Sequence, residues 1–308
     1  MPPPVLMFLG FVLFGTCLVA FATGWPWLVL LFKWYVQGPL KNRRESEFPA
    51  RRQFTAVSRD ALPPDEVTAH AAAERQLVAQ GYTLAAHFVP ALILKYTQSS
   101  VSLWLQPLEK AMALVMAVRV KRPDFPARAN DFCTLHTLFV DGSSVETTNA
   151  GREAFPPDPA CDMVRWPGMF DLSVLHRLHV ARVALFRRGR DATLPPPEHA
   201  LQFLQEQEQM GHLHRARSGH LWFDAGQDAF RLTLKGAASM RWKLLWPWKQ
   251  RLASRHERRL RRVLAEVGMG TPEQYAPHPK DAEAPPGLSY ESGARPERAC
   301  PPAVEPVD

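Results

Sequence analysis

His176 and His179 are the residues whose type and spacing come nearest to a metal site in this chain. Three positions apart on a predicted helix, they lie on one face, and neutral imidazole binds zinc when further ligands converge on it. The same face carries Leu172, Leu175 and Val183, so both rings are also well placed to form hydrogen bonds inside a core. No HExxH or CxxC spacing accompanies them. We therefore predict no bound metal and no cofactor, and keep this pair as the alternative.

The other residues that could do chemistry are scattered along the chain. His212, His214 and His220 form a second group, on a predicted loop and strand. Patterns typical of hydrolases, dinucleotide-binding proteins and P-loop enzymes are absent. The sequence thus favours a protein without catalytic activity, and the alternative is a membrane-tethered enzyme that uses the His176/His179 surface. The four cysteines show no CxxC spacing and are predicted to be free thiols: Cys17, Cys133, Cys161 and Cys300.

A basic segment that contains tryptophans lies between Arg241 and Arg262. It holds nine basic residues against one acidic residue, Glu257. The predicted helix in this segment places apolar residues on one side and arginines on the other, which is the composition of an interfacial membrane helix. The residues predicted to meet lipid are Trp242, Trp246, Trp248, Arg255, Arg258, Arg259 and Arg262.

Two alternatives remain open for the basic segment. Its apolar side could pack against the domain and leave the arginines in water, as most charge runs do. The arginines could also bind nucleic acid, but no recognisable nucleic-acid-binding fold accompanies them. We therefore expect membrane lipid as one partner, through the N-terminal helix and this segment. An unidentified protein is the second expected partner, and nucleic acid is not expected.

An apolar segment near the start predicts a membrane anchor. No charged residue occurs among the 28 positions from Val5 to Phe32. At ~1.5 Å per residue such a helix measures about 42 Å, which crosses the ~30 Å hydrocarbon core once but not twice. The sequence thus predicts one N-terminal transmembrane helix. Aromatic residues that prefer the membrane interface lie at its C-terminal end: Trp25, Trp27, Trp34 and Tyr35.

The charges on either side of the apolar segment predict its orientation. Only the amino terminus precedes it, whereas basic residues follow it closely, beginning with Lys33, Lys41 and Arg43. The positive-inside rule therefore places the C-terminal bulk in the cytoplasm and the N-terminus outside. A cleavable signal peptide ending near Ala22 fits less well, because no basic residue precedes the apolar run. We expect a single-pass protein of a bacterial inner (plasma) membrane.

Local patterns after residue 64 predict an α+β domain with an antiparallel sheet and several helices. Helices are expected from Asp65, as N-cap, to Gln80, from Asp171 to Arg188, and from Glu198 to Met210 with a cap at Gly211. The dipeptide Asp141-Gly142 predicts a two-residue type I′ hairpin. We expect about four to six antiparallel strands covered by helices on one face. The predicted strands are 82–89, 101–106, 112–120, 132–140, 143–149, 219–223 and 229–234.

Length and composition complete the expected organisation. The chain has 308 residues and a net charge of +7, and its mean hydropathy of -0.21 excludes a polytopic transporter. The expected function is a single-pass membrane protein whose non-catalytic cytoplasmic interaction domain contacts a protein partner or the membrane face. A membrane-tethered nucleic-acid-binding regulator is a further alternative. The predicted parts are a transmembrane anchor at 1–36, a basic Pro-containing linker at 37–63, an α+β core at 64–190, a helix, hairpin and basic amphipathic helix at 191–268, and a disordered C-terminal tail at 269–308.

Overall fold

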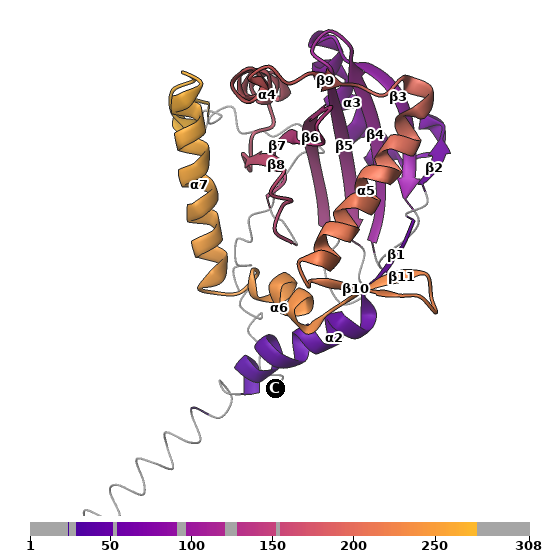
Figure 1. Ribbon diagram of the computed structural model, residues 1–308, viewed down its shortest axis with the longest axis vertical. Coiled ribbons are helices and arrows are strands. Elements are labelled where there is room, and N and C mark those ends of the chain that lie inside the picture. Colours follow the sequence, from indigo (N-terminus) through magenta and orange to yellow (C-terminus); the bar gives the residue numbers. More distant parts are fainter. Residues whose placement is uncertain are drawn as a thin grey trace, which may run out of the picture.

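The computed structural model of the chain describes residue 24 and residues 29–51, 54–90, 97–120, 128–151 and 155–275. Within these residues the fold is α+β, as the sequence predicts, with two sheets and several helices (Figure 1). The helices are η1 Lys33–Gln37, α2 Gly38–Glu45, η2 Arg59–Ala61, α3 Pro64–Ala79, α4 Leu172–Arg187, η3 Pro197–His199, α5 Ala200–Arg217, α6 Leu234–Trp242, α7 Trp248–Glu266 and η4 Pro272–Tyr275. The strands are β1 Glu47–Pro49, β2 Phe54–Val57, β3 Thr83–Pro90, β4 Thr97–Gln106, β5 Ala111–Val120, β6 Arg128–Phe139, β7 Ser144–Thr148, β8 Cys161–Arg165, β9 Ala192–Thr193, β10 Leu221–Asp224 and β11 Ala229–Leu232.

The larger sheet is mixed. Its order is β2-β3-β4-β5-β6-β7-β8, and β9 pairs with the end of β6. Neighbouring strands are antiparallel from β2 to β7, but β7 and β8 run parallel. The prediction of a purely antiparallel sheet is therefore wrong at this pair. Residues 149–160 connect β7 to β8, and a parallel pair requires such a crossover of about a dozen residues instead of a tight hairpin.

Helices cover both faces of the larger sheet, not one face as predicted. On one face α3, α4 and α7 enclose the main core, and on the other face α5 packs against β3, β4 and β5 (Figure 1). As a consequence, strand β5 has each of its faces in a different core. Met112 and Leu114 pack on the α5 side, while Ala113 and Val115 lie in the main core. The alternation of large and small residues in β5 therefore separates two cores, not a core from solvent.

A smaller sheet with the order β1-β11-β10 lies at the end of the molecule that carries α2 and α6 (Figure 1). Its first strand belongs to residues 37–63, which were predicted to be a linker. Instead, Phe48 in β1 pairs with Phe230 in β11, and β2 from the same stretch forms an edge of the larger sheet. Pro49 ends the edge strand β1, a position that tolerates a proline.

Two helix boundaries differ from the prediction. Helix α3 starts at Pro64 with Pro63 as N-cap, and Asp65 lies in the first turn, where its carboxylate pairs with Arg119 at 2.9 Å. Helix α5 continues through Gly211 to Arg217. A glycine inside a helix costs only about 1 kcal/mol, and contacts of α5 with both sheets offset this cost.

The Asp141-Gly142 turn joins β6 and β7 as predicted, but its loop has three residues. The Phe139 amide donates to the Ser143 carbonyl, and the Gly142 amide donates to the Phe139 carbonyl. Gly142 has a φ of 81°, whereas a type I′ turn needs positive φ at Asp141 as well. It is the three-residue hairpin loop in which a type I turn is followed by a glycine in the left-handed conformation.

The predicted membrane anchor falls almost wholly outside the residues that the structure describes. Of the run Val5–Phe32, Gly24 and residues 29–32 are described, and they are helical. In the described ranges, no helix combines the length and the apolar character that a bilayer crossing needs. Trp25, Trp27 and residues 276–308 of the predicted tail are also outside these ranges. Residues 269–275 are ordered on the domain, with Tyr275 packed edge-to-face against Trp166.

Candidate functional site

The two predicted groups of aromatic residues meet in the folded chain. The indole Nε1 of Trp242 donates to the carbonyl oxygen of Tyr35 at 3.1 Å, and the Tyr35 hydroxyl donates to the carbonyl oxygen of Trp246. The Tyr35 and Trp242 rings are 6.5 Å apart. We call this surface, carried by η1, α6 and the start of α7, the aromatic base. It consists of Trp34, Tyr35, Trp242, Trp246 and Trp248.

The tryptophans of the aromatic base are unusually exposed. Trp246 is 71% exposed and Trp248 is 46% exposed, and Trp34 and Trp242 are also exposed. The neighbouring Leu244 is exposed as well. Large aromatic side chains are normally well buried, and a contiguous exposed apolar patch marks a surface that binds a partner or a membrane.

Two glycines allow the helices that carry this surface to approach closely. A Cβ atom at Gly236 in α6 would collide with the backbone carbonyl oxygen of His220. A Cβ atom at Gly38 in α2 would lie 2.9 Å from Nε of Arg241 in α6. Thr233 caps α6 by accepting a hydrogen bond from the Gly236 amide. These local features hold α6 against both the smaller sheet and α2.

A groove of about 590 Å³ lies beside the aromatic base, between η1–α2 and α6. This volume falls within the range of small-molecule sites. Three polar residues of α6 and its neighbourhood line the groove: Lys235, Ser239 and His220. Most of its walls are apolar, and the apolar residues are Val36, Pro39, Leu40, Leu234, Ala238 and Trp242.

Positive charge surrounds the aromatic base and the groove. Helix α2 carries Lys41, Arg43 and Arg44, and its one acidic residue, Glu45, pairs with Lys41 at 3.8 Å. Helix α6 contains basic residues and no acidic residue. This end of the molecule therefore combines exposed aromatic rings with cations, which suits an anionic surface.

Helix α7 starts at the aromatic base and runs along the side of the molecule (Figure 1). Its apolar side packs in the main core, where Leu264 is completely buried and Leu260 nearly so. Val164 and Trp166 are among the residues of that core. The apolar side of the basic segment thus faces the domain, which is the alternative arrangement considered for this segment, and it is not available to lipid.

The arginines of α7 project from the opposite side of the helix. Arg259 pairs with Asp162, whereas Arg255, Arg258 and Arg262 are exposed. At ~1.5 Å per residue, Arg255 lies about 10 Å and Arg262 about 21 Å beyond Trp248 along the helix axis. Only the first of the four predicted arginines is therefore close to the aromatic base.

His179 lies on the buried side of α4 and uses both ring nitrogens within the protein. Its Nδ1 lies 3.0 Å from the Thr147 hydroxyl, and its Nε2 lies 3.0 Å from the Thr137 hydroxyl. Burial holds the pKa of His179 well below its usual range, so the ring is neutral. Hydrogen bonds to two strands occupy the positions that a metal would need.

His176 has two partners of its own. Its Nδ1 lies 3.2 Å from the Tyr82 hydroxyl, and its Nε2 lies 3.2 Å from a carboxylate oxygen of Glu109. Burial lowers the pKa of His176, and the Glu109 charge opposes this effect. No set of three or more histidine, cysteine, aspartate or glutamate side chains in the described ranges is placed to hold a metal ion.

The second histidine group does not form one site. His212 is buried among aromatic side chains of the smaller sheet. His214, which lies on α5 and not on a loop, is 3.4 Å from Asp158. His220 has its Nδ1 2.8 Å from the Ser218 hydroxyl. The three rings therefore serve three separate contacts.

The thiols of Cys133 and Cys161 are free. Burial raises the pKa of each thiol to about 12, so both remain protonated at neutral pH. Neither thiol has the depressed pKa of a reactive cysteine.

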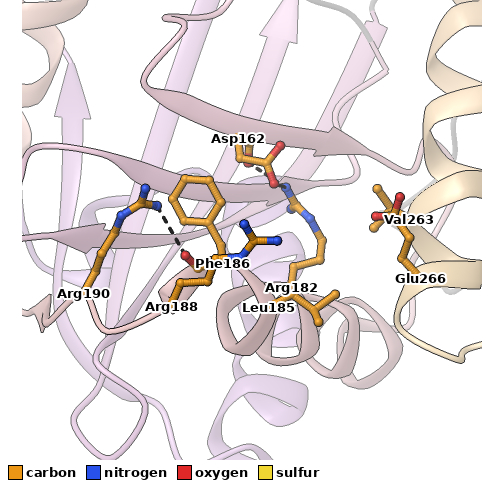
Figure 2. A pocket seen from close by; sticks show the side chains of 8 residues that line it. All are labelled: Asp162, Arg182, Leu185, Phe186, Arg188, Arg190, Val263 and Glu266. Carbon is orange, nitrogen blue, oxygen red and sulfur yellow. Dashed lines mark hydrogen bonds and ion pairs between the residues drawn. The ribbon is translucent and has the colours of Figure 1, made fainter.

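Sequence reasoning missed a cleft of about 330 Å³ between α4 and α7 (Figure 2). Arg182 lines it and is only 3% exposed, with its guanidinium 2.8 Å from the Asp162 carboxylate and bonded to the Glu146 carbonyl oxygen. Burial lowers the pKa of Arg182, and Asp162 opposes this effect. In the sequence, the only indication of this cleft is Arg182 itself, a basic residue three positions after His179 on the apolar side of the predicted helix. Because Asp162 also pairs with Arg259, these charges link α4, β8 and α7 to one another.

The chain matches no known family model, no curated protein and no solved structure. The geometry of the aromatic base and of the groove beside it is therefore the basis for assigning a function.

Proposed function

We propose that the chain is a single-pass protein of the bacterial plasma membrane, with its N-terminus outside. Its cytoplasmic domain is a non-catalytic interaction domain whose aromatic base lies against the inner face of the membrane. The contact of Tyr35 with Trp242 and Trp246 carries this proposal. It joins the residues that follow the apolar N-terminal segment to tryptophans more than 200 positions away.

The chemistry of the aromatic base supports a place at the lipid headgroups. Tryptophan and tyrosine prefer this region because one part of the ring is apolar and another donates a hydrogen bond. Each basic residue close to an anionic leaflet adds about 1 kcal/mol. A tether at the N-terminus raises the effective concentration of the surface, so modest contacts suffice.

The packing of α7 changes which residues would meet lipid. With Leu260 and Leu264 in the core, α7 does not lie flat on a membrane. Among the residues of α7 that were predicted to meet lipid, Trp248 and Arg255 are the nearest to the membrane in this arrangement, whereas Arg258 and Arg262 are available to a protein partner beside it. The buried hydrogen bonds of His176 and His179 give no support to an enzyme that uses them.

The proposal is tested with the full chain in lipid nanodiscs. A spin label at position 246, introduced as Trp246→Cys, is compared with a label at position 258, introduced as Arg258→Cys. Both sites are exposed, but only the first belongs to the aromatic base. Collision rates with molecular oxygen, which concentrates in lipid, and with a water-soluble nickel chelate report the surroundings of each label.

We expect the label at 246 to collide mainly with oxygen and the label at 258 mainly with the nickel chelate. In both proteins Cys17, Cys161 and Cys300 are replaced by serine and the buried Cys133 is kept, so that each protein carries one label. Equal access of the nickel chelate to both positions would refute contact between the aromatic base and the membrane.

A further inference from the structure

We infer that the groove between η1–α2 and α6 holds an acyl chain of an anionic phospholipid, with the lipid phosphate on Lys235. This inference rests on the proposed function, because the contact of the aromatic base with the membrane is what brings lipid to the groove. It adds a specific binding site to a surface that would otherwise only lie on the bilayer.

The walls of the groove are mostly apolar, and several of their side chains are exposed to water. Val36, Leu40, Leu234 and Trp242 line it and are between 39% and 54% exposed. Exposed apolar side chains that face one another across a groove lose contact with water when a chain of methylene groups enters. Each buried methylene contributes about 0.8 kcal/mol, so an acyl chain is a fitting occupant.

The groove is continuous with the aromatic base. Trp242 belongs to both, since its ring lines the groove and its Nε1 donates to the Tyr35 carbonyl oxygen at 3.1 Å. Val36, the next residue after Tyr35, lines the groove on the opposite side. An acyl chain can therefore pass from the bilayer into the groove without crossing a polar surface.

The charge at the groove selects an anionic lipid. The Lys235 ammonium donates to the Ser218 carbonyl oxygen at 2.6 Å, which holds it in place. An ammonium has three donors, so the same group can also bind a phosphate oxygen. Arg241 and Lys243 follow on the same segment, and α6 contains no acidic residue. A zwitterionic headgroup brings its own cation into this positive surface, whereas an anionic one does not.

The experiment uses the full chain in nanodiscs and a phosphatidylglycerol that carries a photoreactive diazirine in one acyl chain. Phosphatidylcholine with the same diazirine chain is the matched probe. Trypsin cuts after Lys235, Arg241, Lys243 and Lys249, so groove residues of α6 and the last two tryptophans of the aromatic base fall on different peptides. Peptide 236–241 contains the groove residues Ala238 and Ser239, and peptide 244–249 contains Trp246 and Trp248.

We expect lipid adducts on both peptides with phosphatidylglycerol. With phosphatidylcholine, adducts on peptide 236–241 should fall about fivefold, the ratio expected for one basic residue beside an anionic headgroup. In Lys235→Gln, whose corresponding peptide is 232–241, this preference for phosphatidylglycerol should disappear. Equal labelling by the two probes in the unaltered chain would overturn the assignment of an anionic lipid.

Two tryptophan substitutions test whether the lipid chain is inside the groove. Leu40→Trp fills the groove from the α2 side without changing peptide 236–241, and it should remove most adducts from that peptide. Leu31→Trp is the control, because Leu31 is also exposed and lies on the same chain segment but does not line the groove. A thermal unfolding curve for each variant establishes that the fold is retained.

The outcomes separate the groove from the aromatic base. Adducts on peptide 244–249 without adducts on peptide 236–241 would overturn the groove assignment and leave the proposed function intact. The absence of adducts from both peptides would overturn both. Equal labelling of peptide 236–241 in Leu40→Trp and Leu31→Trp would show that the lipid chain does not occupy the groove.

Discussion

Among single residues, His70 is a buried titratable group on the side of α3 that faces the larger sheet. Its Nε2 lies 2.9 Å from the Ser100 hydroxyl and its Nδ1 lies 3.0 Å from the Ser102 hydroxyl. Burial lowers the pKa of His70 to about 4, and the positive charges of His87 and Arg119 act in the same direction. His70 in the folded protein is therefore neutral above about pH 4.

This lowered pKa predicts a loss of stability in mild acid. Below about pH 6.5 the unfolded chain binds a proton at His70, while the folded chain does so only near pH 4. Stability therefore falls as the pH decreases through this interval. At about pH 5 the contribution of His70 is a loss of about 2 kcal/mol relative to neutral pH. Urea unfolding of the full chain at the two pH values measures it.

The variant His70→Gln is the control for this prediction. Glutamine does not titrate in this range but can still form a hydrogen bond with a serine hydroxyl. The change in unfolding free energy between the two pH values should be smaller in the variant by about 2 kcal/mol. An identical pH dependence in both proteins would show that His70 is not responsible.

At the scale of helices and strands, α7 has two sides with different roles. Its apolar side joins β8 to the main core, and its basic side is exposed. We expect Leu264→Ala to lower the unfolding free energy by about 2–5 kcal/mol, because it removes buried methyl groups and leaves a cavity. Arg258→Gln on the opposite side should change it by less than about 0.5 kcal/mol.

Thermal unfolding monitored by circular dichroism measures both substitutions in α7. Comparable small effects of Leu264→Ala and Arg258→Gln would contradict the packing of the apolar side, and the interfacial helix would then be the better description of this segment.

Other elements show which structures a local sequence pattern is sufficient to predict. Helix α4 forms where the sequence predicts a helix, and the structure adds that Asp171 caps it by accepting from the Ser173 and Val174 amides. The hairpin of β10 and β11 also forms where turn residues separate two short apolar segments. In contrast, the alternation in β5 does not show that both of its faces are buried, because the second face is covered by α5, which is distant in sequence.

For the whole molecule, the charge asymmetry around the apolar N-terminal segment predicts the topology. A reporter fused after Asp308 that is active only in the cytoplasm should be active, and its counterpart that is active only after export should not. The physical reason is that basic residues such as Lys41 and Arg43 are retained on the cytoplasmic side.

Two results would contradict this topology. Activity of the export-dependent fusion would reverse the orientation of the chain. A mature protein that begins near Thr23, as determined by N-terminal sequencing, would show that the apolar segment is a cleaved signal peptide and not an anchor.

The sequence by itself determined the features that depend on neighbouring residues: the positions of most helices and strands, the places of the two hairpins, the apolar run Val5–Phe32 and the basic character of residues 241–262. These can be read locally because capping, turn geometry and charge act over a few positions. Only the tertiary structure decided that α7 packs against the domain, that β8 runs parallel to β7, and that Arg182 is buried beside Asp162. It also brought Tyr35 to Trp242, since such a contact depends on how the sheets and helices between them pack, which no local pattern records.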